Sequence, residues 1–195
     1  MSATASVTGA VTDDSGAPLA GVEVRAYNAS GATAKATTTN AAGVFTLDGL
    51  AAGTYTLRFA RTGVVTEYHS NATSASTATP ITLTPGSTFV ADATVSVTAT
   101  VTGAVIDDGG TPLAGVEVRA YTASGVTAKA TPTDAAGVFS LDGLAAGTYR
   151  LRFARAGVVT EFFSDAVSLA TATPITLTPG STITADATLT ATSPG

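Results

Sequence analysis

The chain contains two tandem copies of one sequence module. Residues 7–97 align with residues 101–191 at a constant offset of 94 without a gap, and 70 of the 91 aligned positions are identical. A single fold with a single site is therefore excluded, because a site inside the module either occurs in both copies or has decayed in one of them. The 21 differences show where this pair of copies tolerates change.

The composition is that of a folded β protein rich in small and β-branched residues. Hydrophobic residues make up 45% of the chain and charged residues only 12%, which excludes a disordered tail and a charged helical protein. Each copy is near the lower end of the sizes that fold without disulfides or metals. We therefore expect two small domains, 1–97 and 98–195, the second ending in a short tether at TSPG.

Charge and cysteine content exclude several further classes. The net charge is −5, and no basic cluster is present that could neutralise successive phosphates, so nucleic acid is not an expected partner. Cysteine is absent, which removes disulfides and thiolate metal sites. No apolar run approaches the roughly 18 residues of a membrane span, and MSATASVTG lacks the basic and apolar regions of a signal peptide. If the parent protein is exported, we expect this sequence to be an internal segment with an added Met.

Apolar residues recur with period two almost throughout, which is typical of half-buried strands. In the first copy the segments SVTGAVT, GVEVRAY, VFTLDGL and GTYTLRF show it, followed by VVTEYH, PITLT and STFVADATV. Glu23, Arg25, Tyr27 and Arg58 alternate outward. The residues expected to face the core of the first copy are Val7, Gly9, Val11, Val22, Val24, Phe45, Leu47, Tyr55, Leu57, Phe59, Ile81, Leu83, Phe89, Ala91 and Val95.

Turn residues separate these strands. Asp13-Asp14-Ser15-Gly16 and Asn40-Ala41-Ala42-Gly43 combine a Gly that supplies positive φ with an Asp or Asn whose side chain closes the turn. About seven or eight short strands at this spacing predict an antiparallel β-sandwich for each copy. No linker separates the copies, because ADATVSVTATVTGAV continues the strand pattern. We expect the two domains to lie end to end with limited bending.

Two sequence blocks carry a family resemblance. GAVTDDSGAPLAGVEVRAY and TNAAGVFTLDGLAAGTYTLRF, with their second-copy counterparts, resemble the carboxypeptidase regulatory-like domain. That domain belongs to the transthyretin-like (prealbumin-like) sandwiches and is related to the Cna-B modules of Gram-positive surface proteins. The later block VVTEYHSNATSASTATPITLTPGSTFVADATV is similar to repeats in exported proteins of high-GC Gram-positive bacteria. The resemblance implies a non-catalytic accessory, spacer or adhesive module.

The Cna-B relationship raises the question of an intramolecular isopeptide bond. In Cna-B modules such a bond joins a Lys of the first strand to an Asn or Asp of the last. Asp92 and Asp186 lie on the expected last strands, but the first strands SVTGAVT and TVTGAVI contain no Lys. Lys35 and Lys129 fall on the third strand of each copy. We therefore predict that neither module is cross-linked.

Acidic turn residues are the only metal candidates. Asp13-Asp14 and Asp107-Asp108 supply hard oxygen ligands, and Asn40 or Asp134 from another turn can join them. The second copy is the better candidate, because Asp134 adds a third carboxylate where the first copy has Asn40. Calcium needs roughly six to eight oxygens, and no known calcium-loop spacing is present. The alternative is that these residues only close hairpin turns, and this interpretation is the favoured one. No cofactor is expected.

Two pairs of adjacent aromatic residues are the candidate binding residues. They are Tyr68-His69 and Phe162-Phe163, and adjacent strand residues face opposite sides. Alternation from Val64 predicts that Tyr68 and Phe162 face the core while His69 and Phe163 face outward. An outward ring can stack on a sugar or a partner protein. A purely structural role for these edge aromatics is the alternative.

The remaining charged residues give no catalytic constellation. Glu23, Arg25 and Arg58, like their second-copy counterparts Glu117, Arg119 and Arg152, are expected to form cross-strand ion pairs of small worth on a solvated face. His69 is the only His in the chain, and the second copy lacks one. A Ser-His-Asp triad in each module is therefore excluded.

Two classes of function fit the sequence. The leading hypothesis is a spacer in a secreted or cell-surface bacterial protein, a monomer whose partners are the neighbouring domains of its own polypeptide. The rival is an adhesive or carbohydrate-binding module that uses the aromatic edge and the loops 70–79 and 164–173, with a polysaccharide or a surface protein as partner. An enzyme is not expected.

Overall fold

The computed structural model describes residues 3–192, and the chain divides into two compact units, Met1–Val97 and Thr98–Gly195. The strands of the first unit are β1 (Ala5–Asp13), β2 (Glu23–Asn28), β3 (Thr33–Thr38), β4 (Val44–Leu50), β5 (Gly53–Ala60), β6 (Glu67–Tyr68), β7 (Ile81–Leu83), β8 (Thr88–Val90) and β9 (Ala93–Val95). The strands of the second unit are β10 (Ala99–Asp107), β11 (Glu117–Thr122), β12 (Thr127–Pro132), β13 (Val138–Leu144), β14 (Gly147–Ala154), β15 (Glu161–Phe162), β16 (Ile175–Leu177), β17 (Thr182–Thr184) and β18 (Ala187–Leu189).

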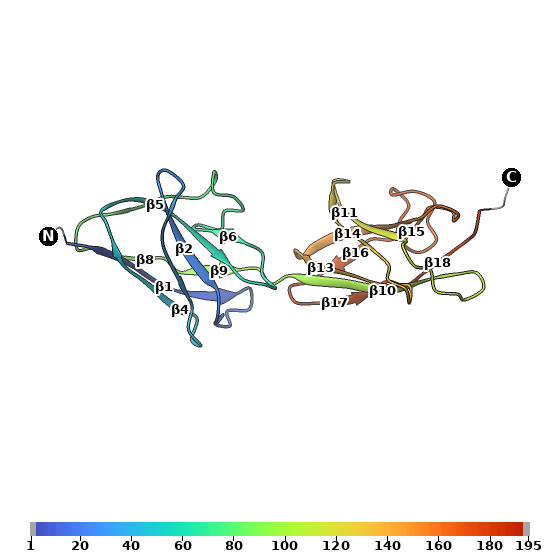
Figure 1. Ribbon diagram of the computed structural model, residues 1–195, viewed down its shortest axis with the longest axis horizontal. Helices are drawn as coiled ribbons and strands as arrows, with labels where there is room; N and C mark the ends of the chain where they lie inside the picture. The colour runs from blue at the N-terminus through green and yellow to red at the C-terminus, as the bar shows by residue number, and fades with distance from the viewer. Residues whose placement is uncertain (1–2, 193–195) are drawn as a thin grey trace. The chain divides into compact units, whose positions relative to one another are not determined.

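Each unit is a pair of sheets (Figure 1). In the first unit one sheet has the order β4-β1-β8, with β9 also pairing β1, and the other has the order β3-β2-β5-β6, with β7 also pairing β5. The second unit repeats this topology with β10–β18. The predicted fold class, two tandem all-β sandwiches, is confirmed. Among the described residues, no helix is long and apolar enough to cross a membrane.

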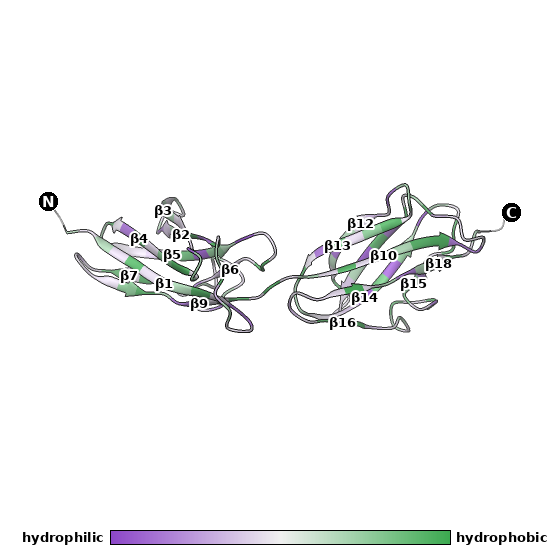
Figure 2. Ribbon diagram, turned by 90° about the horizontal axis from the view of Figure 1, so that it is seen from below, coloured by the Kyte–Doolittle hydropathy of each residue, from purple (hydrophilic) through white to green (hydrophobic). Residues whose placement is uncertain are grey.

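The core of each unit lies between its two sheets and follows the alternation of the sequence. Leu57 and Phe59 on β5 are fully buried, whereas Arg58 between them is half-buried. Figure 2 shows apolar and polar bands alternating along the long strands. Every expected core residue of the first unit is buried except Phe89, which is half-buried. Complete burial of one such Leu or Phe side chain contributes about 1.5–3 kcal/mol.

Gly9 and its counterpart Gly103 allow the first and last strands to approach closely. A Cβ placed on Gly9 would collide with the carbonyl oxygen of Ala91, and a Cβ on Gly103 would collide with that of Ala185. Neither glycine has positive φ. Glycine is therefore needed at these positions because a side chain would not fit, and not because of the backbone conformation. This explains why an otherwise apolar, inward-facing row of residues contains a Gly.

The last strand differs from the prediction in two ways. STFVADATV was expected to be one strand, but it divides into β8 and β9 at Ala91 and Asp92. Both pieces pair with β1 in parallel, whereas all other ladders of the unit are antiparallel. At the break, Asp92 Oδ1 accepts a hydrogen bond from the Ala10 amide at 2.8 Å. A side chain thus replaces the backbone acceptor that the ladder loses there.

The predicted turn chemistry is confirmed. Asp13 Oδ1 accepts hydrogen bonds from the amides of Ser15 and Ala17 at 2.8 and 2.9 Å, and Gly16 has a φ of 83°. The hydrogen bond from the Ser15 hydroxyl, followed by those from the backbone, lowers the pKa of the Asp13 carboxyl. Asn40 makes the same two contacts in its own turn at 2.9 and 3.0 Å.

Candidate functional site

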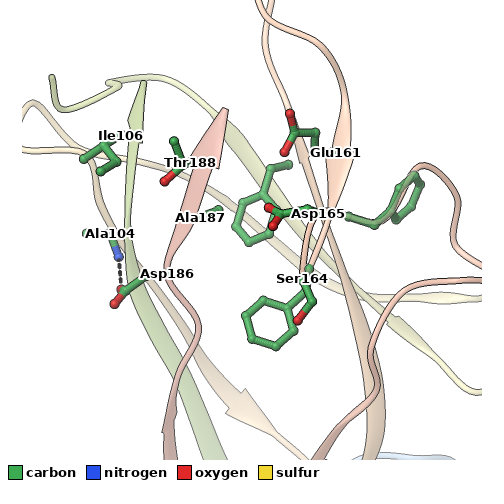
Figure 3. A pocket seen from close by; sticks show the side chains of 11 residues that line it. Ala104, Ile106, Glu161, Ser164, Asp165, Asp186, Ala187 and Thr188 are labelled. Carbon is green, nitrogen blue, oxygen red and sulfur yellow. Dashed lines mark hydrogen bonds between the residues drawn. The ribbon is translucent and has the colours of Figure 1, made fainter. Parts of the chain in front are cut away.

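A concavity of the second unit lies between the β10–β18 ribbon and the hairpin that follows β15 (Figure 3). Its volume is about 540 Å³. A smaller concavity of about 380 Å³ adjoins Arg150 on another part of the unit. The first unit has an equivalent of the larger one, about 360 Å³ in volume, lined by Ala10, Asn71 and Asp92 among others. The polar and aromatic residues that line the larger groove are Phe153, Glu161, Phe162, Phe163, Ser164, Asp165, Asp186 and Thr188.

The carboxylates at this groove hold the backbone in place. Asp186 Oδ1 accepts a hydrogen bond from the Ala104 amide at 2.8 Å, drawn as the dashed line in Figure 3. Glu161 Oε1 accepts one from the Thr190 amide at 3.4 Å. In the first unit Glu67 is only 9% exposed and accepts a hydrogen bond from the Ser96 amide at 3.0 Å. Two carboxylates of the groove, those of Glu161 and Asp186, therefore serve the backbone.

The hairpin beside the groove has an unusual backbone. Tyr68 and Ala72 exchange two backbone hydrogen bonds, and between them Ser70 and Asn71 have φ values of 68° and 57°. Ser164 and Asp165 repeat this conformation with 63° and 56°. Asn and Asp tolerate the left-handed region because their side chains bond locally, whereas Ser adopts it at a cost of about 1 kcal/mol. This turn was not predicted from the sequence, although the Ser-Asn and Ser-Asp pairs are its signal.

The predicted orientation of the aromatic pairs is wrong. Tyr68 lies opposite Arg58 in the β5–β6 ladder, so its side chain shares the outer face of that sheet. His69 instead packs its ring against Phe89, with centroids 5.8 Å apart and an interplanar angle of 74°. The cause is that Val64 and Glu67 are both buried three residues apart, so the alternation skips one residue before β6.

The second unit shows the same reversal. Phe162 lies opposite Arg152 in the β14–β15 ladder and shares its outer face, while Phe163 packs against the core. The loop 164–173 behind them is held by hydrogen bonds between Ser168 and Thr171, and its Val167 is 87% exposed.

The outer sheet face carries a row of arginines in each unit. Arg25 lies directly opposite Arg58, and both approach Glu23, at 2.7 and 3.4 Å. In the second unit Arg119 and Arg152 approach Glu117 at 2.9 and 3.6 Å. The Glu23–Arg58 and Glu117–Arg152 contacts are the expected cross-strand ion pairs, whereas the contacts of Arg25 and Arg119 lie within one strand. In the described part of the chain, Arg25 Nε and Arg119 Nε are the two buried side-chain nitrogens or oxygens without a hydrogen-bond partner.

The calcium candidates serve turns and strand ends. Asp107 Oδ1 accepts hydrogen bonds from the amides of Gly109 and Thr111, and Asp134 Oδ1 makes the equivalent contacts in its own turn. Asp108 accepts one from the Thr190 hydroxyl at 3.4 Å. Within residues 3–192, no group of three or more His, Cys, Asp or Glu side chains is arranged to hold a metal ion.

Solved structures with a similar chain course include a Bacillus anthracis protein and two pilins. The Bacillus anthracis TIE protein is 18% identical over 97% of this chain and 34% of its own, with a TM-score of 0.43. A streptococcal ancillary pilin is 16% identical over 94% of this chain and 62% of its own, with a TM-score of 0.46. The shaft pilin SpaA of Lactobacillus rhamnosus GG is 16% identical over the whole of both chains, with a TM-score of 0.45. This chain spans less than two thirds of the first two proteins.

The family assignment comes from the sequence of each unit separately. No curated protein sequence matches the chain significantly. The carboxypeptidase regulatory-like domain matches residues 6–98 and again residues 100–190. These two matches coincide with the two sandwiches and cover nearly the whole chain. The chain therefore belongs to the carboxypeptidase regulatory-like domain family, of which it contains two tandem copies.

Proposed function

We propose that the chain is a non-catalytic spacer of an exported or cell-surface bacterial protein. The observation that carries this proposal is the parallel pairing of first and last strands within a unit. Because β9 runs parallel to β1 and ends beside Asp13, the chain enters a unit at one end and leaves it at the other. The strand β1 has 9 residues from Ala5 to Asp13, and their extended backbone spans about 27 Å along the unit.

The short connection between the units supports the same proposal. Only Ser96, Val97 and Thr98 lie between β9 and β10. The Ser96 amide donates to Glu67, and the Val97 amide donates to Asp14 Oδ2 at 3.1 Å. The first unit therefore holds two of the three connecting residues, which supports a connection stiffer than a flexible tether.

Small-angle X-ray scattering of the intact chain tests the spacer proposal. We expect a narrow, elongated distance distribution. A matched variant with about ten Gly and Ser residues inserted between Val97 and Thr98 should broaden it, since such linkers behave as flexible coils. A wild-type distribution as broad as that of the variant would contradict the proposal.

A second candidate function is adhesion to a polysaccharide or a surface protein. The observation that favours it is the outward ring of Tyr68 or Phe162 beside the arginines of the same sheet face. Aromatic rings and guanidinium groups are both enriched at binding surfaces.

A further inference from the structure

We propose that the outer sheet face of each unit binds an acidic polysaccharide. The inference deepens the second candidate function and rests on it, whereas the spacer proposal stands independently. The two arginines would bind carboxylates of the glycan, and the flanking rings would pack on its sugars. We call this surface the arginine face; it consists of Tyr27, Arg25, Arg58 and Tyr68 in the first unit and of Tyr121, Arg119, Arg152 and Phe162 in the second.

Strand register places these side chains on one surface. Arg119 is the partner of Arg152, and Arg152 is the partner of Phe162, so the three form a row across β11, β14 and β15. Tyr121 follows two residues after Arg119 on the same side of β11 and lies opposite Arg150. The row is accessible, because the side chains of Arg119 and Arg152 are 33% and 30% exposed.

The charges of the face are not balanced. Like charges directly opposite each other on a sheet are destabilising, yet both units place two guanidinium groups in this arrangement against one glutamate. The hydrogen bond to Glu117 and its negative charge raise the pKa of Arg119, so this guanidinium stays charged. One positive charge therefore remains in excess, and Arg150, where the first unit has Thr56, adds another to the second unit.

The hydrogen-bonding capacity of the face is also unfilled. A guanidinium has five N–H donors in a fork that matches a carboxylate. The contact of Arg152 with Glu117 is long, at 3.6 Å, and Arg119 meets Glu117 through Nη2, while its Nε is buried. A carboxylate arriving from solvent at this row would take up terminal N–H groups that the single glutamate leaves free.

The geometry favours a glycan over other polyanions and over proteins. Two arginines per unit match a polymer with about one carboxylate per sugar, whereas nucleic acid needs a row of cations for its closely spaced phosphates. The ring of Phe162 at one end of the row and that of Tyr121 beside Arg119 on β11 suit stacking on sugar faces. A stable protein interface usually buries about 800 Å² per partner, more than a row of four side chains provides.

Native affinity electrophoresis of the full chain tests the proposal, with polygalacturonate as the acidic probe and dextran as the neutral reference. We expect retardation by polygalacturonate that falls with added salt, and none by dextran. Arg152→Gln should weaken binding roughly fivefold, since a charged bidentate contact is lost, and the Arg58→Gln/Arg152→Gln double variant should abolish it. Phe162→Leu, which removes the ring but keeps apolar bulk, should weaken it roughly threefold.

Lys129→Gln is the matched control, because it removes the same charge from an exposed position on β12. Lys129 lies opposite the buried Ala120 and therefore does not share the arginine face. It should leave retardation unchanged. Thermal melting of every variant separates loss of binding from loss of fold. The proposal is overturned by absence of wild-type retardation, by equal retardation in dextran, by an unaffected double variant, or by an equal effect of Lys129→Gln.

Discussion

At the scale of single residues, the two copies act as controls for each other. Gly9 and Gly103 are retained in both, and in both a side chain would collide with the backbone of the last strand. Gly109 is replaced by Ser15 in the first unit, where the hydroxyl donates to Asp13 at 2.6 Å. The repeat therefore separates glycines needed for close approach from glycines that are free to change.

This contrast predicts the stability of two variants. Gly103→Ala should destabilise the second unit by about 1–3 kcal/mol, because the Ala185 carbonyl must move. Gly109→Ser should change the free energy of unfolding by less than about 0.5 kcal/mol, since the first unit accommodates that residue. Urea unfolding of both variants checks the pair. Equal free energies of unfolding for the two variants would contradict this prediction, because they would show that β10 can move away from Ala185 at little cost.

At the scale of elements, the sequence predicted the long strands and their inward faces, because period-two alternation is strong over six or more residues. It failed where segments are short. Glu67 and Tyr68 form a two-residue strand. Val64 and Glu67 are both buried although they are three residues apart, so the alternation of buried and exposed residues is interrupted before this strand, and no local sequence pattern predicts the interruption. The break between β8 and β9 depends on contacts with β1 that are distant in sequence, including the Asp92 bond to Ala10.

The parallel pairing of first and last strands predicts a mechanical property. Pulling on the two ends of a unit slides β10 along β17 and β18, so that their hydrogen bonds are loaded together. Pulling between a handle at Gly109→Cys and the C-terminus instead separates β10 from β18 at one end, bond by bond. Single-molecule force spectroscopy should find a higher unfolding force in the first geometry. Equal forces in both would contradict the shear arrangement.

At the scale of the whole molecule, the fold and its duplication followed from the repeat and the turn residues, whereas the candidate site did not. The aromatic pairs were predicted as candidate binding residues from the sequence. Only the pairing of the strands shows that Tyr68 and Phe162 lie on the same sheet face as the arginines. A site built from three strands depends on register, and register is fixed by the folded sheet. The calcium candidates illustrate the opposite case, because local turn chemistry accounts for Asp107 and Asp134.

The covalent state of the chain is the last prediction. An isopeptide bond between Lys and Asp releases one water, and one between Lys and Asn releases one ammonia. The lysines of the two units, Lys35 and Lys129, lie on β3 and β12, whereas Asp92 and Asp186 bond to amides of β1 and β10. We therefore expect the intact mass to equal the sequence mass after allowance for the initiator Met. A deficit of one water or ammonia per unit would show a cross-link and contradict the expectation.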